Sequence, residues 1–203
     1  RFMNMIIYDS YEFDKKLFAV TICEMVQWSI KFGVCSHSAV AFASYGVLML
    51  TTFEDFGKGR DLATSALMLN ERLSDSYNQS EVYLIAWAFL RPWTHLFSSC
   101  RKHLLSAYHV GLSVGDQGHA TYNIHLYILM GWYAGEPLKK LEVDCRTRIQ
   151  QMKELNHTRT MERALIAYQT ILNLMGRSGK PGELKGDAIN HEEVVHHYKI
   201  AQR

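Results

Sequence analysis

The chain has 203 residues and is 48% hydrophobic, enough for one domain, or two small ones, with a sizeable core. Its 22 basic and 20 acidic side chains give a net charge of +2, which excludes the strongly basic surface expected of a nucleic-acid-binding protein. The longest apolar runs, at 39–50 and 82–90, are shorter than the ~20 residues that cross a bilayer, so we expect no membrane insertion.

The four cysteines lie far apart along the sequence, at positions 23, 35, 100 and 145. This spacing matches neither a metal site nor a dense disulfide framework, and it favours a reducing, cytoplasmic location. The chain begins with Arg1 and shows no signal peptide, so we expect it to be part of a longer protein.

The apolar residues recur at helical spacing, and no stretch sustains a period of two, so the sequence predicts an all-α fold. The first expected helix covers residues 12–31 and is apolar over much of its circumference, which indicates cover on several sides. The next begins near Ser36 and Ser38, whose hydroxyl groups are candidate N-caps because they accept hydrogen bonds from first-turn N–H groups. It ends near Phe53, and after two glycines a leucine stripe marks another helix up to Leu73.

Further helices are expected at about 81–90, 94–113, 119–133, 138–152 and 161–175. The helix at 81–90 ends before Pro92, because the residue before a proline disfavours the α region. Residues 176–186 are expected to form a loop, and residues 187–203 an exit helix or linker toward a following domain. The apolar stripes predict that four residues are buried between helices: Leu62, Leu69, Leu141 and Ile149.

Large aromatic residues recur near the turn inside successive helical pairs, at Phe53, Trp93 and Trp132, which are 40 and 39 residues apart. A period of about 40 residues with two helices per unit is typical of helical repeat arrays. We therefore predict a TPR-like α-α superhelix of roughly eight helices over residues 1–186. Besides flanking helices, its units cover about 36–73, 77–113 and 116–155.

Stacked helical pairs leave extended surfaces that bind partners or neighbouring domains. Phe53, Trp93 and Trp132 are the predicted interaction edge, because large aromatic residues near turns are hard to bury fully and are favoured at interfaces. The aromatic residues of the chain have two interpretations, a ligand pocket or an interdigitated helical core, and the core is the more frequent case. A basic residue follows each edge position, as a polar rim or as a solvated helix start: Arg60, Arg101 and Lys140.

Three features resemble active-site motifs, and each lacks something that the chemistry needs. His191 and His196 flank two glutamates as in a zinc-protease helix, but they are five residues apart and diverge by roughly 140° on a helix. The segment Gly176–Lys180 lacks the first glycine and the preceding strand of a phosphate-binding loop. His119 and His125 are six apart on one expected helix, which favours a solvated or core-edge role over a metal site. We therefore expect no catalytic, cofactor or metal site in this chain.

Several segments, taken in order, resemble a known family: residues 25–46 (MVQWSIKFGVCSHSAVAFASYG), 56–73 (FGKGRDLATSALMLNERL), 111–127, 134–138 (AGEPL) and 172–186. They are similar to the helical, tetratricopeptide-like region of very large bacterial and eukaryotic signalling proteins. Those proteins carry a Ser/Thr-kinase-like domain and an AAA-type ATPase domain before this region, and a GAF domain and often a histidine-kinase module after it. The resemblance covers most of the chain between residues 25 and 186.

The resemblance implies a non-catalytic regulatory or scaffolding segment of a multidomain sensor kinase/ATPase in signal transduction. Its partners would be the flanking domains of the same chain and other proteins, with ATP and Mg²⁺ bound in the neighbouring domains. The alternative is a free-standing protein–protein interaction scaffold of the TPR-like type. The sequence on either side of this segment in the gene separates the two hypotheses.

Overall fold

The computed structural model describes residues 2–189, apart from the side chains of residues 8, 9 and 12. Over this range the chain forms nine α-helices, one π-helical turn and one 3₁₀ turn, with no β-strand, which confirms the all-α prediction. The elements are α1 (Phe2–Phe13), α2 (Lys15–Phe32), α3 (Ser38–Phe53), α4 (Phe56–Arg72), α5 (Ser76–Ile85), η1 (Ala86–Leu90, π), η2 (Arg91–Trp93, 3₁₀), α6 (Phe97–Ser113), α7 (Gln117–Tyr133), α8 (Leu138–Glu154) and α9 (Thr158–Leu174).

Residue contacts divide the chain into two compact units, 1–123 and 124–203, and the boundary lies inside α7. The repeat boundaries proposed from the sequence stay a prediction. The exit helix predicted over residues 187–203 falls almost entirely on residues 190–203, outside the described part of the chain. None of the helices within residues 2–189 combines the length and the apolar content needed to cross a membrane.

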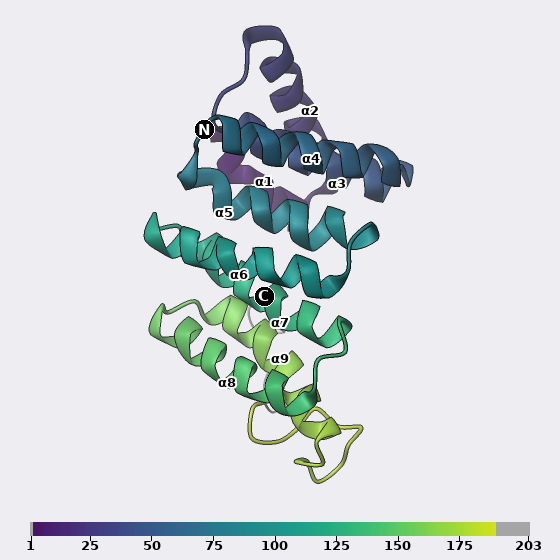
Figure 1. Cartoon of the computed structure of the whole chain (residues 1–203), viewed down its shortest axis with the longest axis vertical. Coiled ribbons are helices and arrows are strands. Elements are labelled where there is room, and N and C mark those ends of the chain that lie inside the picture. Colours follow the sequence, from purple (N-terminus) through teal and green to yellow (C-terminus); the bar gives the residue numbers. More distant parts are fainter. Residues whose placement is uncertain (1, 190–203) are drawn as a thin grey trace. The chain divides into compact units, whose positions relative to one another are not determined.

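In the first unit, consecutive helices pack against each other: α1 on α2, α3 on α4, and α5 on α6 (Figure 1). Helices α3 and α4 approach closely at Gly46 and Gly59. A Cβ atom on Gly46 would lie 2.8 Å from a Leu90 methyl group and 3.3 Å from the Gly59 carbonyl oxygen. Glycine is therefore favoured at position 46, because a side chain there would displace the Leu90 methyl group and press on the backbone of α4.

The start of the chain differs from the prediction in two ways. Residues 2–32 form two helices rather than one over 12–31, because Asp14 accepts hydrogen bonds from the N–H groups of Lys16 and Leu17 at 3.0 Å and starts a new helix. The predicted capping of α3 by Ser36 or Ser38 is also wrong. His37 precedes the helix without a side-chain cap, and the Ser38 hydroxyl accepts from the Cys35 N–H and pairs with the hydroxyl of Ser29.

The second unit contains the rest of α7, together with α8 and α9, which pack against each other. Leu141 on α8 is 1% exposed, as predicted. Leu62 and Leu69 in the first unit and Ile149 in the second are only half-buried, so the prediction that they are buried is wrong for these three. The helical periodicity predicted that each of these residues lies on the inner side of its helix. In the structure each lies at the margin of the core.

The loop after α9 is attached to that helix by two amides, which we call the loop anchor. Asn173 donates hydrogen bonds to the carbonyl oxygens of Pro181 and Glu183, at 3.1 and 2.7 Å. The Gln169 carbonyl oxygen accepts from the N–H groups of Ala188 and Ile189. Both amide side chains are buried, and Gln169 donates to Asn173 at 2.8 Å, so the loop is tied down without a charged group in the anchor.

Candidate functional site

Two members of the predicted interaction edge are exposed in the first unit. Phe53 ends α3 and is 64% exposed, and Trp93 ends η2 and is 60% exposed. Phe56, the first residue of α4, packs edge to face against Trp93 with ring centroids 4.9 Å apart. The Trp93 indole N–H donates to the Phe89 carbonyl oxygen at 3.0 Å, which fixes the ring while leaving most of it in contact with solvent. Phe56 and Trp93 are called the exposed aromatic pair below.

Trp132 differs from the other two edge positions. It lies in the second unit, where it is half-buried and lines a groove formed by α7 and α9. A single edge through Phe53, Trp93 and Trp132 therefore stays a prediction, whereas the exposure of the first two is observed.

The basic residues after the edge positions have different environments. Arg60 is exposed and contacts Asp61 at 2.9 Å, and Lys140 contacts Glu136 at 2.7 Å. Arg101 is only 5% exposed, so its proposed place in a polar rim or at a solvated helix start is wrong. Two of the three basic side chains are thus available at the surface, each beside a carboxylate.

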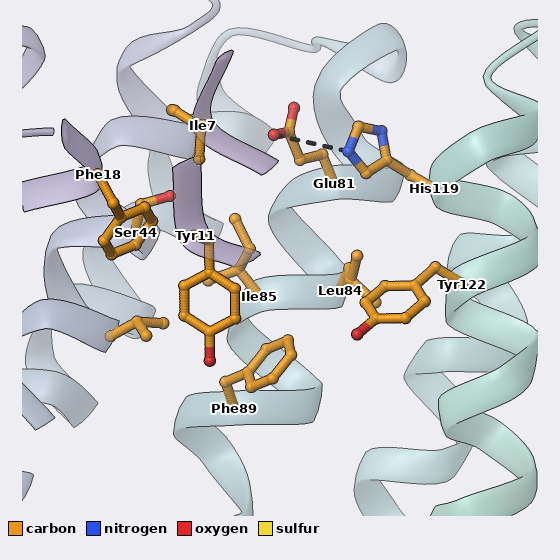
Figure 2. A pocket seen from close by; sticks show the side chains of 11 residues that line it. Ile7, Tyr11, Phe18, Ser44, Glu81, Leu84, Ile85, Phe89, His119 and Tyr122 are labelled. Atoms are coloured by element: carbon orange, nitrogen blue, oxygen red, sulfur yellow. Dashed lines mark ion pairs between the residues drawn. The ribbon is translucent and has the colours of Figure 1, made fainter. Parts of the chain in front are cut away.

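The first unit also contains a small apolar cavity with a volume of about 50 Å³. Apolar and aromatic side chains from α1, α2, α3, α5, η1 and the start of α7 make up most of its wall (Figure 2). Tyr11 on α1 packs edge to face against Phe18 and Phe89, with ring centroids 5.1 and 6.1 Å apart. Three polar residues, Ser44, Glu81 and His119, also line the cavity.

A partly buried acid–histidine cluster borders this cavity and consists of Asn4, Glu81, Asp116 and His119, of which Glu81 is buried. The Asn4 amide donates to the Glu81 carboxylate at 2.9 Å, and the other Glu81 oxygen lies 3.7 Å from Nε2 of His119 (Figure 2). Nδ1 of His119 lies 2.9 Å from the Asp116 carboxylate, which also accepts from the His119 backbone N–H. The cluster joins α1 to α5 through the hydrogen bond from Asn4 to the Glu81 carboxylate, and α5 to the start of α7 through the Glu81–His119 ion pair.

The environment shifts two pKa values in this cluster upward. Burial raises the pKa of the Glu81 carboxyl, although the charge of His119 and the hydrogen bond from Asn4 oppose this shift. Burial alone would lower the pKa of His119, but its hydrogen bond with Asp116 and the charges of Glu81 and Asp116 outweigh burial and raise the pKa. His119 therefore keeps its proton to a higher pH than an exposed histidine does.

Serine, histidine and a carboxylate around one cavity invite comparison with a hydrolytic triad. In a triad, one histidine nitrogen accepts the proton of the serine while the other is oriented by the carboxylate. Here both imidazole nitrogens of His119 face carboxylates, so neither nitrogen is placed to accept the proton of a serine. The Ser44 hydroxyl has no hydrogen-bond partner among the described residues. The arrangement holds helices together and lacks the proton path of a triad.

The motif fragments in the sequence form no site in the described part of the chain. Residues 176–180 form the exit of α9, where Gly176 has φ +76° and Lys180 pairs with Glu183 at 2.8 Å. His191 and His196 lie outside the described residues. Within residues 2–189, no group of three or more histidine, cysteine, aspartate or glutamate side chains is arranged to hold a metal ion.

The acid–histidine cluster could not be predicted from local patterns, because its members are far apart in the sequence, at positions 4, 81, 116 and 119. One signal was present: Glu81 is the lone carboxylate at the start of the apolar run 82–90, and a carboxylate on an apolar face needs a partner. No sequence pattern singled out Phe56, the ring that Trp93 contacts. No protein-family model, curated protein or solved structure matches the chain.

Proposed function

We propose that this chain is a non-catalytic helical scaffold that holds a neighbouring protein domain through the exposed aromatic pair. The sequence resemblance supports a location inside a multidomain sensor kinase/ATPase, between an AAA-type ATPase domain and a GAF domain. Its role there is regulatory. The nucleotide state of the ATPase domain changes the packing of the helical pairs, and the altered packing changes the contact with the GAF domain. Such coupling requires an element with two arrangements that both neighbours bias.

The observation that carries the proposal is the exposure of Trp93 next to Phe56. Tryptophan is enriched among residues that dominate binding energy, and an aromatic ring left in solvent gains most from being covered. The indole N–H of Trp93 is already bonded to the Phe89 carbonyl, so docking an apolar surface on the ring leaves no donor unsatisfied. The ring is therefore held ready for contact with a partner.

The test uses two exposed tryptophans of the same unit. The domains encoded before and after this segment are made as separate proteins, and their binding to the 203-residue chain is measured by calorimetry. We expect Trp93→Ala to weaken binding by about tenfold or more, because it removes a central aromatic contact. Trp28→Ala is the matched control, since Trp28 is also exposed, at 54%, but lies on α2. Both variants should melt within a few degrees of the parent, because neither ring is buried.

Three results would contradict the proposal. Equal binding by the Trp93→Ala variant and the parent would show that the aromatic pair is not the docking surface. Stoichiometric ATP binding or phosphate transfer by the chain alone would show that it is catalytic. A gene that encodes no kinase or ATPase domain beside this segment would leave the alternative, a free-standing interaction scaffold, with partners to be found among separate proteins.

A further inference from the structure

A polar hollow with a volume of about 300 Å³ lies in the first unit, where α4 ends and α5 begins. Its wall is formed by the last turn of α4, the connecting turn, the first turn of α5 and Tyr83. The volume is at the lower end of the range of about 300–1,000 Å³ that is usual for small-molecule sites. This space, called the α4–α5 hollow below, shares no residue with the exposed aromatic pair or with the apolar cavity.

The lining of the α4–α5 hollow is acidic. It includes the carboxylates of Glu71 and Asp75, and none of its residues is basic. The Asp75 carboxylate already accepts hydrogen bonds from the N–H groups of Tyr77 and Asn78, at 3.1 and 3.3 Å, and from the Asn78 amide. Glu71 is exposed, and its side chain forms no ion pair within residues 2–189. Asp75 therefore contributes a fixed charge, whereas Glu71 is available for direct contact with a ligand.

The helix ends beside the hollow also favour a cation. Asn70 and Glu71 lie in the last turn of α4, where the helix dipole is negative. The N-terminal end of α5 would attract an anion, but Asp75 caps it with its carboxylate. An anionic ligand would thus meet two carboxylates and no basic side chain.

An independent observation is a buried amide in the same lining. Asn70 is 4% exposed, and its Oδ1 atom has no hydrogen-bond partner among the described residues. A buried carbonyl oxygen without a donor costs free energy, so such an atom indicates a missing partner. The χ2 torsion of asparagine is broad, which lets the amide turn its oxygen toward a ligand in the hollow. A ligand with several N–H donors would satisfy this oxygen and Glu71 together.

We propose that the α4–α5 hollow binds a guanidinium group, with the Glu71 carboxylate and Oδ1 of Asn70 as acceptors and the charge of Asp75 as support. A guanidinium group carries five N–H donors in a planar fork, which matches a carboxylate with two parallel hydrogen bonds and leaves donors for the amide oxygen. An ammonium group is a more strongly hydrated point charge with three donors, so it gains less here. The guanidinium group belongs to a small molecule or to an arginine side chain of another protein.

The first experiment compares the guanidinium group with a neutral group of the same shape and with another cation. Butylguanidinium, butylurea and pentylammonium are titrated into the isotope-labelled 203-residue chain and followed by NMR. We expect butylguanidinium to shift the side-chain amide signals of Asn70 and to bind about fivefold or more tightly than butylurea, because charged hydrogen bonds are stronger than neutral ones. Pentylammonium should bind more weakly than butylguanidinium. Equal binding of butylguanidinium and either other probe, or no saturable shift of the Asn70 signals up to about 10 mM, would overturn the proposal.

The second experiment uses variants of the two acceptors. Glu71→Gln should abolish most of the preference for butylguanidinium over butylurea, whereas Glu24→Gln, which changes an exposed carboxylate on α2 of the same unit, should keep it. Asn70→Leu replaces the unpartnered amide by an apolar side chain of similar size, so we expect weaker binding of butylguanidinium without a lower melting temperature. If Asn70→Leu does not fold, the exposed position of Glu71 still provides the test. An unchanged preference in Glu71→Gln, or parent-like binding by a folded Asn70→Leu, would contradict the site.

A pair of peptides identifies the source of the guanidinium group. An acetylated and amidated Gly-Arg-Gly peptide is compared with the same peptide carrying citrulline, the neutral counterpart of arginine. We expect the arginine peptide to bind more tightly than the citrulline peptide, and equal binding of the two would count against the proposal. Tighter binding of the arginine peptide than of butylguanidinium supports the arginine of a partner protein, and weaker binding supports a small molecule.

Discussion

The two units of this chain bury polar side chains in contrasting ways. In the first unit, Glu81 and His119 form a charged contact that joins helices far apart in the sequence. In the second unit, the loop anchor of Gln169 and Asn173 uses only neutral amides and ties down a loop adjacent in sequence. Charged contacts are strong but depend on protonation, whereas amides do not titrate. The contacts of the cluster in the first unit therefore respond to pH, whereas those that hold the loop of the second unit do not.

One histidine in each unit, His119 and His125, extends this contrast, because their pKa values shift in opposite directions. His119 has a raised pKa, so its contribution to stability is complete below pH 6.5 and is lost as the pH rises through its folded-state pKa. The raised pKa of Glu81 acts in the same direction, at lower pH. His125 in the second unit has a pKa lowered to about 4, so between about pH 4 and pH 6.5 this histidine is protonated in the unfolded chain but neutral in the folded unit. Acid therefore favours the folded first unit through His119 and opposes the folded second unit through His125.

The largest expected effect is that of breaking the charged cluster. Glu81→Ala leaves His119 beside an empty space and Asn4 without its acceptor, and we expect a loss of about 3–5 kcal/mol in the free energy of unfolding. Urea unfolding followed by tryptophan fluorescence measures it, since Trp28, Trp87 and Trp93 lie in the first unit. Glu81→Gln is the control: it keeps an acceptor for Asn4 and should cost less. A parent-like midpoint for Glu81→Ala would show that the cluster does not stabilise the unit.

The next effect is the opposite response of the two histidines to acid. A pKa lowered from 6.5 to about 4 corresponds to about 3 kcal/mol that the second unit loses as the pH falls from about 6.5 to about 4. NMR titration of the histidine Hε1 signals measures both groups, with His119→Gln and His125→Gln used to assign them. We expect a midpoint near 4 for His125 and one above 6.5 for His119. Two midpoints on the same side of 6.5 would remove the contrast between the units.

The smallest effect is expected in the neutral loop anchor. Gln169→Ala removes the acceptor for the N–H groups of Ala188 and Ile189, and we expect a loss of about 1–3 kcal/mol without added pH dependence. Trypsin cleavage after Lys185 should become faster, because the loop is held mainly through this helix. The matched control is Thr170→Ala, which removes a hydroxyl that bonds within its own helix. Slow, parent-like cleavage of Gln169→Ala would show that other contacts hold the loop.

Local sequence patterns predicted most of the helices, but they did not predict the acid–histidine cluster. Helical periodicity predicted α3, α4 and α6 to α9 to within a few residues, because each has an apolar stripe bounded by glycine or polar turns. Helix α1 was not predicted, because Asp14, the residue that separates it from α2, lies among other polar residues that do not single it out as a cap. The contact between Glu81 and His119 was beyond local reasoning, since it depends on which helices meet. The exposure of Phe53 and Trp93 could be predicted, because large aromatic residues near turns are hard to bury fully.

The π-helical turn before Trp93 has a consequence for how this segment can change in evolution. The Arg91 N–H bonds to the carbonyl oxygen of Ala86, five residues back, so the turn holds one residue more than an α-helical turn. Deletion of a single codon within residues 86–90 would restore α-helical spacing and rotate everything after it by about 100°. Trp93 would then point in another direction without being mutated itself. Substitutions in this turn are thus tolerable where they preserve packing. A change in its length would instead separate the Trp93 ring from the Phe56 ring.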